Sequence, residues 1–258
     1  MIRSENGYWS EGTSPRWFVS SKSDLGGLYV KPYFSAGYGL PHWIWAGVDV
    51  NAISTLEFGQ AYAGVRGSTP IFDVAFGVRD TYSYSKPFLD PRPAFIADDL
   101  TGPGKNARYW AWELEVVGAV PLPHSAVLLD YIAVRTLDVP RGKLVYDESY
   151  RAIVADPFFQ VFRVAAVARL LREDSLKVGV LLELLTSTGR SENVFRMGPA
   201  FDLQLTDHLE ALGTLSVAVS SPDRLGLALG AYGLGGVRYR WATGERSPEP
   251  PWRGPMIP

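Results

Sequence analysis

The chain has 258 residues with a formal net charge of -2, and 47% of its residues are hydrophobic. This apolar content excludes a disordered chain, and the near-neutral charge argues against nucleic acid as a partner, because phosphate binding leaves a basic excess. The lack of cysteine excludes disulfide bonds and thiolate metal sites. No apolar run reaches the roughly 18 residues that a membrane-spanning helix needs. Met1 to Trp17 lacks the apolar core of a signal peptide, so an exported protein would need a signal that precedes this chain, whereas a soluble protein would not.

The N-terminal half of the chain divides into short segments in which apolar residues alternate with polar or small ones. Residues 15–22 form the first segment, and in the second, 28–38, Val30, Phe34 and Tyr38 share one face. Strand side chains alternate between two faces, so this period of two predicts β-strands with one apolar face each. The following segments of this kind are 43–52, 56–66, 71–84, 108–120 and 126–136.

The C-terminal half contains five further segments. The clearest is 225–241, which places Trp241 on an apolar face and Arg238 on the opposite one. Two others are ambiguous, because Phe158 to Leu171 and Leu176 to Leu185 could each form an amphipathic helix instead of a strand. Read as strands, the five segments are 157–171, 176–186, 193–205, 209–219 and 225–241.

The lengths of the connections test the number of strands, since a membrane barrel has short turns at one end and longer loops at the other. With thirteen candidate strands, short and long connections fall out of phase after the seventh. The phase is restored when Lys143 to Val154, which carries Asp147, Glu148 and Arg151 with poor alternation, becomes part of a loop. We therefore predict an all-β fold, a closed antiparallel transmembrane β-barrel of about twelve strands. An isolated hairpin at its start would reduce the barrel to ten.

Residues 15–241 resemble bacterial outer-membrane β-barrel proteins in their alternating faces, in the aromatic residues near the segment ends, and in Trp241 at the end of the last segment. The resemblance implies a place in the outer membrane of a Gram-negative-type bacterium, in contact with its lipid, with short periplasmic turns and longer extracellular loops. It makes residues 1–14 a periplasmic N-terminal segment and residues 242–258 a Pro-rich periplasmic tail. Many such barrels end in an aromatic residue, whereas here the tail follows Trp241.

Charged residues in the predicted strands fall on the face opposite to the apolar one. An Arg or Lys that points into hydrocarbon costs roughly 2–4 kcal/mol at the midplane, so these side chains are expected to line the lumen. They could form charge rings that select solutes in a channel, or ion pairs that fill a closed lumen without conduction. The predicted lumen-lining charges are Lys31, Asp49, Glu57, Asp73, Arg79, Glu113, Glu115, Asp130, Arg163, Arg169, Lys177, Glu183, Arg196, Asp202, Arg238 and Arg240.

The histidines argue against an enzyme. The chain contains three, His42, His124 and His208, and the predicted topology puts all of them in periplasmic turns. Barrel hydrolases generally resemble enzymes with a His-centred nucleophile site near the outer leaflet, in which the base lies within hydrogen-bond reach of the nucleophile. Three scattered histidines also make no metal site. We therefore predict no catalytic residue, no metal and no cofactor.

Two segments outside the strands could contact partners. Residues 85–107, the longest predicted outer loop, are rich in proline and could fold inward as a plug, present a binding surface or form a flexible cap. The tail 242–258 favours an extended, polyproline-like conformation. It could dock a periplasmic or envelope protein, or it could be a disordered end.

Three functions follow from these observations. The first is a channel or passive transporter with a charged lumen. The second is a non-conducting outer-membrane anchor or subunit of a multiprotein envelope complex, such as gliding or secretion machinery. The third is a soluble enzyme, which only the missing signal and the two ambiguous segments favour.

Overall fold

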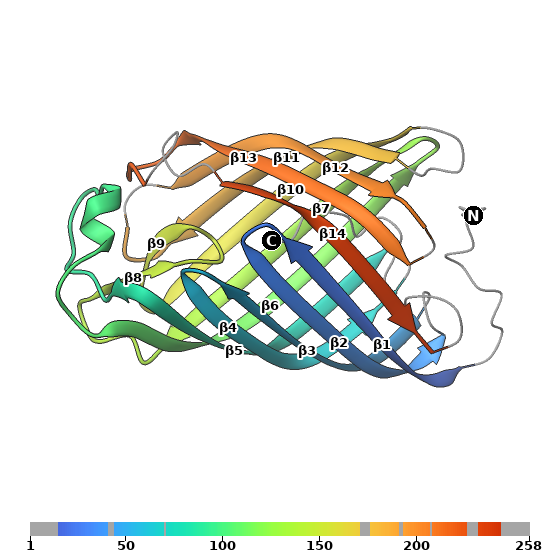
Figure 1. Cartoon of the computed structure of the whole chain (residues 1–258), viewed down its shortest axis with the longest axis horizontal. Coiled ribbons are helices and arrows are strands. Elements are labelled where there is room, and N and C mark those ends of the chain that lie inside the picture. Colours follow the sequence, from blue (N-terminus) through green and yellow to red (C-terminus); the bar gives the residue numbers. More distant parts are fainter. Residues whose placement is uncertain are drawn as a thin grey trace.

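A computed structural model describes residues 15–40, 44–69, 71–170, 176–190, 193–206, 208–225 and 232–243. Within these residues, twelve antiparallel strands close into one barrel, as predicted (Figure 1). Strands neighbouring in sequence are neighbours in the sheet, and β1 pairs with β14 to close the ring. The barrel strands are β1 (Arg16–Gly26), β2 (Tyr29–Leu40), β3 (Ile44–Thr55), β4 (Phe58–Ser68), β5 (Phe72–Pro87), β6 (Asn106–Leu122), β7 (Ser125–Leu137), β10 (Phe158–Leu170), β11 (Leu176–Ser187), β12 (Val194–Gln204), β13 (Leu209–Ser220) and β14 (Tyr232–Ala242).

The structure resolves the two ambiguities of the sequence. Both segments that could have formed helices are strands, β10 and β11, which pair with each other over their whole length. Strand β1 pairs with β2 on one side and with β14 on the other, which excludes the ten-stranded alternative. No helix among the described residues is long and apolar enough to cross a membrane.

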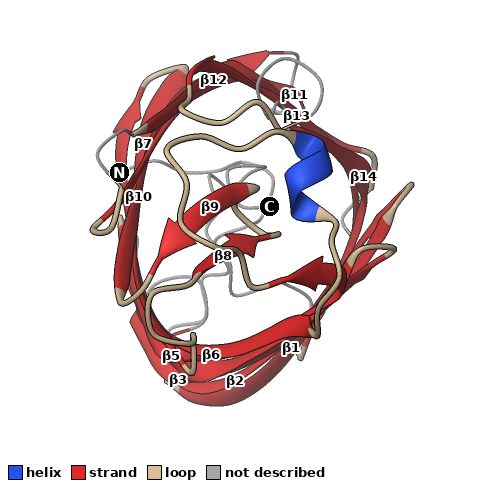
Figure 2. Cartoon of the chain, turned by 90° about the vertical axis from the view of Figure 1, so that its left-hand side faces the viewer, coloured by secondary structure: helices blue, strands red, loops and turns tan. Residues whose placement is uncertain are grey.

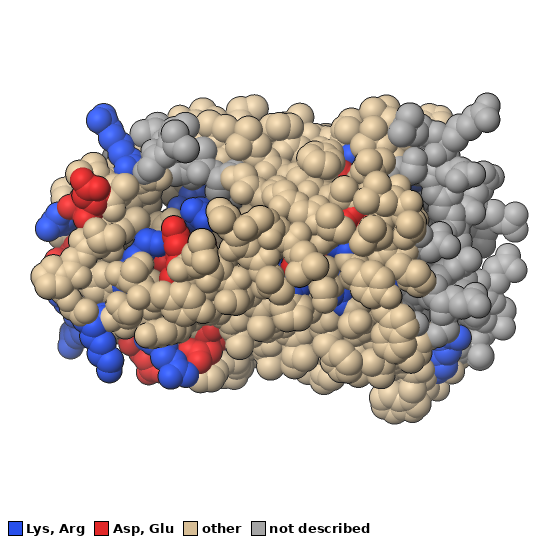
Figure 3. Space-filling view, in the orientation of Figure 1, with Lys and Arg blue, Asp and Glu red and all other residues tan. Residues whose placement is uncertain are grey.

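The outer surface of the barrel carries an apolar belt. Val48, Phe76, Trp112, Leu182 and Phe201 each expose more than a third of their surface on outward-facing positions. The rings of Phe76 and Trp112 stack across β5 and β6 with centroids 5.3 Å apart. On the face shown in Figure 3, charged atoms are sparse in the middle, while many Lys, Arg, Asp and Glu side chains lie at the left-hand end of the view. Apolar exposure on this scale is typical of a surface that faces lipid.

The two ends of the barrel differ in their connections. At the end where β1 begins and β14 ends, which we call the short-turn end, the strands are joined by residues 41–43, 69–71, 123–124, 171–175 and 205–208. At the opposite, long-loop end, four connections are longer: 88–105, 138–157, 188–193 and 221–231. The other two, 27–28 and 56–57, are as short as the turns. The wall is therefore low over β1 to β4.

The segment Lys143 to Val154 crosses no membrane, as predicted, but it is not an exposed loop. It forms a two-stranded hairpin, β8 (Leu144–Asp147) and β9 (Ala152–Ala155), which lies inside the ring of barrel strands (Figure 2). We call residues 144–155 the plug hairpin. All of its strand residues are buried.

Residues 88–105 lie over the plug hairpin rather than inside the barrel. Leu89 and Leu144 exchange two backbone hydrogen bonds of 2.9 Å, and the short helix η1 (Ala97–Leu100) contributes Leu100 to an apolar cluster with the hairpin. This loop is therefore not the plug: it packs over the hairpin, and the plug comes from its neighbour. We call residues 88–105, which cover the hairpin at the long-loop end, the cap.

Candidate functional site: a plugged lumen with a side cavity

The lumenal charges are joined in ion pairs. Arg66 on β4 contacts Asp49 and Asp73 on the neighbouring strands and reaches Glu115 at 3.3 Å, and it also donates to the hydroxyl of Tyr33 at 2.7 Å. The side chain of Arg66 is only 6% exposed. These contacts join β2 to β6 along the inner wall near the short-turn end. Near the same end, the rings of Phe18 and Trp45 pack edge to face with centroids 5.0 Å apart.

A second network binds the plug hairpin to the opposite wall. Glu183 on β11 accepts from Arg163 at 2.8 Å and from Arg196 at 2.6 Å, and these three side chains are each 1% exposed. Arg196 also donates to the backbone carbonyls of Tyr150 and Arg151, both at 2.8 Å. One wall residue, Arg196, thus satisfies two backbone acceptors at the tip of the hairpin, which an inserted loop must pair once it leaves water.

A third set of contacts holds the acidic residues of the hairpin. Asp147 accepts from Arg79 at 2.6 Å and from the hydroxyl of Tyr109 at 2.7 Å. Glu148 pairs with Lys86 at 2.9 Å, and Lys86 also reaches Glu57 at 2.9 Å. Burial raises the pKa of Glu148 from its ordinary value of 4.5 to about 7, although the ammonium of Lys86 acts in the opposite direction. Burial in the docked hairpin thus disfavours the charged form of this carboxyl.

The predicted lumen-lining residues lie inside the barrel wall, with one exception. Arg238 pairs with Asp24 at 2.7 Å, Arg240 with Glu210 at 2.7 Å, and Lys177 with Asp202 at 3.1 Å. Glu57 is the exception, because it lies in the exposed turn between β3 and β4, where it borders the cavity at the rim. The remaining predicted residues are buried or half-buried: Lys31, Asp49, Asp73, Arg79, Glu113, Glu115, Asp130, Arg163, Arg169, Glu183 and Arg196.

The inward-facing residues of β4 were not recognised from the sequence. The even-numbered residues Phe58, Tyr62 and Arg66 face inward, so Arg66, the centre of one ion-pair network, was missed. The alternation around Tyr62 and Arg66 would have revealed it. Asp147 and Glu148 were missed for a different reason, because no local pattern shows that a charged loop enters the lumen.

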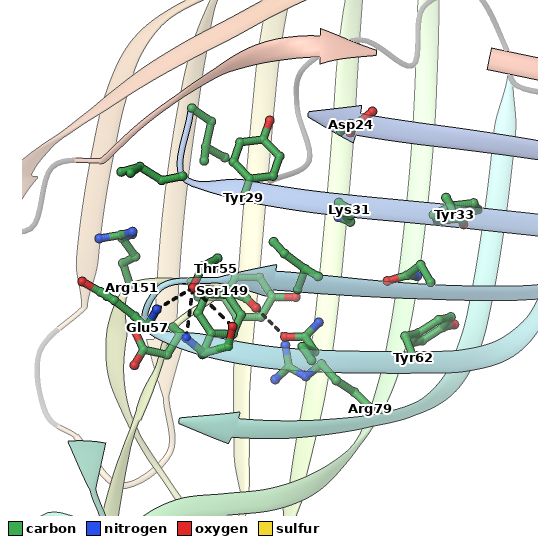
Figure 4. A pocket seen from close by; sticks show the side chains of 18 of the residues that line it. Asp24, Tyr29, Lys31, Tyr33, Thr55, Glu57, Tyr62, Arg79, Ser149 and Arg151 are labelled. Carbon is green, nitrogen blue, oxygen red and sulfur yellow. Dashed lines mark hydrogen bonds between the residues drawn. The ribbon is translucent and has the colours of Figure 1, made fainter. Parts of the chain in front are cut away.

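A cavity of about 290 Å³ remains between the plug hairpin and the low wall. Tyr29, Lys31 and Tyr33 line it from β2, while Ser149 and Arg151 line it from the hairpin tip (Figure 4). Arg151 and Glu57 lie toward the long-loop end, and Tyr33 and Tyr62 lie deeper (Figure 4). Leu28 and Leu56, at the tips of the two short hairpins, also line the cavity and are 69% and 80% exposed. The cavity is therefore open at the low rim.

The two described histidines lie far from this cavity in the chain topology. His124 is in the turn between β6 and β7, and His208 precedes β13, where its Nδ1 lies 3.0 Å from the carbonyl oxygen of Arg240. Both are at the short-turn end, whereas His42 lies outside the described residues. Residues 1–14 and 244–258, which include nearly all of the predicted tail, also lie outside them. The described part of the chain holds no cluster of three His, Cys, Asp or Glu residues suited to a metal ion.

No family model matches the sequence, and no curated protein is significantly similar to it. The structure is similar to OmpT, an outer-membrane protein of Vibrio cholerae, in a form without loop L8, with 10% identity, a TM-score of 0.41 and coverage of 88% of this chain and 99% of that one. It is also similar to the translocator domain of the autotransporter NalP from Neisseria meningitidis, with 12% identity, a TM-score of 0.36 and coverage of 89% and 88%. A third similar structure is the β domain of the Bordetella autotransporter BrkA, with 10% identity, a TM-score of 0.36 and coverage of 88% of this chain and 97% of that one.

These likenesses are too distant to transfer a function. The closed ring of twelve strands, the apolar belt outside it and the charged lumen inside it stand on the structure itself. This protein has the fold of an outer-membrane β-barrel.

Proposed function

We propose that the protein is a gated passive transporter in the outer membrane of a Gram-negative-type bacterium. The long-loop end faces outward and the short-turn end faces the periplasm, in keeping with the usual distribution of loop lengths in such barrels. The proposal includes no catalysis. The role of the charged lumen is to admit a solute when the plug hairpin moves.

One observation carries the proposal: the lumen is closed mainly by a loop rather than by the wall. The plug hairpin is joined to the barrel by its two chain ends, by polar contacts from Arg79, Lys86 and Arg196, and by an apolar cluster with the wall that includes Tyr150. Ion pairs can exchange for water when a segment moves into solvent, because the cost of burying their charges is then recovered. A loop held in this way can leave the lumen without breaking any barrel strand pair.

The test is to lock the hairpin and measure conductance. Ser149 at the hairpin tip donates a hydrogen bond to Gln60 on β4, and the chain contains no cysteine. The double variant Ser149→Cys/Gln60→Cys can therefore be joined specifically by oxidation or by a short thiol cross-linker. In planar bilayers we expect channel openings that disappear on cross-linking and return on reduction. Each single variant treated identically is the control.

Absence of openings in the uncross-linked protein at every voltage would contradict a transporter. It would support the second candidate, a non-conducting anchor or subunit of an envelope complex. The observation that favours this candidate is the burial of Arg163, Glu183 and Arg196, because an aqueous pore would hydrate its charges. Pull-down from native membranes should then recover stoichiometric protein partners, bound by the loops or by the tail 242–258.

A further inference from the structure

Arg151 occupies an unusual position at the tip of the plug hairpin. Its backbone has a φ of 47°, in the left-handed region that side chains other than glycine rarely adopt. Arg196 fixes this conformation by donating to the Arg151 carbonyl at 2.8 Å. Backbone strain at a single residue often marks a functional position. The Arg151 side chain lines the outer end of the cavity (Figure 4).

The guanidinium of Arg151 makes no hydrogen bond or ion pair with any residue that the structure describes. Its charge interacts with Glu57 at longer range, while the neighbouring wall arginines Arg79 and Arg163 are both in ion pairs. Arg151 is half-buried, so its charge is only partly hydrated. A guanidinium presents a planar fork of donors that matches a carboxylate. The cavity thus contains a cation available to a ligand at its outer end.

The charges of the lining are largely offset by ion pairs. Seven basic and five acidic side chains line the cavity, but Arg66, Arg79 and Arg163 also pair with carboxylates behind the lining. The preference for an anion therefore rests on Arg151 at the outer end. The basic residues are Lys22, Lys31, Arg66, Arg79, Arg151, Arg163 and Arg238, and the acidic residues are Asp24, Glu57, Glu113, Glu115 and Glu148.

The rest of the lining suits an apolar body of limited size. Tyr29, Tyr62 and Phe58 offer aromatic surface, and Ile53 and Leu56 offer aliphatic surface, beside the mouth and along the wall. The volume of about 290 Å³ is near the lower limit for small-molecule pockets. A polymer or a two-chain lipid would not fit in it.

We propose that this cavity binds a small organic carboxylate, with its carboxylate on Arg151 and its aromatic or aliphatic body against the tyrosines and Ile53. The assignment deepens the proposed transport function by naming a class of solute. Binding does not require the plug hairpin to open, however, so it can be measured in a barrel that does not conduct.

The experiment measures binding to the full-length barrel in detergent by calorimetry. The probes are benzoate, hexanoate and two ligands that differ from benzoate in charge, benzyl alcohol and benzylamine. We expect the carboxylates to bind more tightly than the neutral and cationic probes. Arg151→Gln should weaken benzoate binding by about tenfold or more, since it removes charge-assisted hydrogen bonds, and Arg151→Lys should lose less. The matched control is Arg141→Gln, an exposed arginine of the same loop.

Three results would overturn the assignment: equal affinity for benzoate and benzyl alcohol, unchanged benzoate binding in Arg151→Gln, or no binding of either carboxylate at millimolar concentration. Heat-dependent gel mobility shows whether each variant is folded. If carboxylates bind but the protein shows no conductance in planar bilayers, the binding site exists but the proposed transport function is wrong. If bilayers conduct while carboxylates do not bind, the transport function stands and this solute class is wrong.

Discussion

The two sides of the lumen differ in what fills them. On the side of β5, β6, β7, β10 and β11, the plug hairpin packs against the wall in an apolar cluster with Tyr109, Val134, Phe159 and Leu185, all at most 2% exposed. On the side of β1 to β4, the wall is low and borders the cavity. The hairpin lies between β7 and β10 in the chain, so it packs against the part of the wall that these two strands form.

The residues that close the lumen therefore lie on one side of it, and the residues proposed to bind a ligand lie on the other. The filled side resembles the interior of a soluble protein, with apolar packing around Tyr150 and ion pairs at its margin. The open side is polar and aromatic, and only the hairpin tip reaches it. Changes to the filled side should therefore alter stability and gating, whereas changes at Arg151 should alter ligand binding.

Removal of the plug hairpin should have the largest effect. Replacing residues 141–156 by a short glycine-rich turn leaves β7 and β10 paired, because these strands bond directly to each other. We expect a folded barrel with a much larger and less voltage-dependent conductance in planar bilayers. Deletion of the exposed residues 102–104 in the neighbouring loop is the control. An unchanged conductance would show that the wall on the open side, not the hairpin, closes the lumen.

Loss of Arg196 should destabilise the filled side strongly. Arg196→Ala leaves Glu183 with one fewer partner and the carbonyls of Tyr150 and Arg151 unpaired. Breaking a buried ion pair costs about 3–5 kcal/mol. The exposed outer pair Arg108–Asp80 gives the comparison, since water screens this pair and Arg108→Ala should cost much less. Urea unfolding of both variants in lipid vesicles measures the difference, and equal losses would contradict the proposed asymmetry.

Gating should depend on pH through Glu148, with a smaller effect. The pKa of Glu148 is raised to about 7 in the docked hairpin, above its ordinary value of 4.5. Docking is therefore favoured below pH 4.5 and loses this contribution as the pH rises through about 7. Open probability should increase over this window, and Glu148→Gln should flatten the profile. Asp90→Asn, which changes an exposed carboxylate of the cap, should preserve it.

The strands were predictable because the membrane enforces one rule along the whole chain. Each strand must present an apolar face to lipid over its full span, so even a faint alternation repeats often enough to be counted. The same rule placed Arg163, Glu183 and Arg238 inside. The prediction missed Arg66, although the alternation on β4 places it on the inward face with Tyr62.

The plug and the cavity could not be predicted in this way. Asp147 and Glu148 have the sequence signature of a solvated loop, and they enter the lumen because Arg79 and Lys86, over sixty residues earlier in the chain, provide their partners. Arg151 depends on a backbone conformation that Arg196 stabilises from another strand. These are long-range effects, whereas periodicity is local.

The direct pairing of β7 with β10 also has a consequence for how the protein is made. Neighbouring strands can associate one after another, but β1 meets β14 only when Ser20 comes beside Ala242, across nearly the whole chain. Closing so long a loop is the entropically costly step, so the seam is expected to form last. By then the hairpin between β7 and β10 can already cover the concave face of the growing sheet. The remaining strands would then add to a sheet that already curves around the hairpin, so contacts with the hairpin would help to set the curvature before the barrel closes.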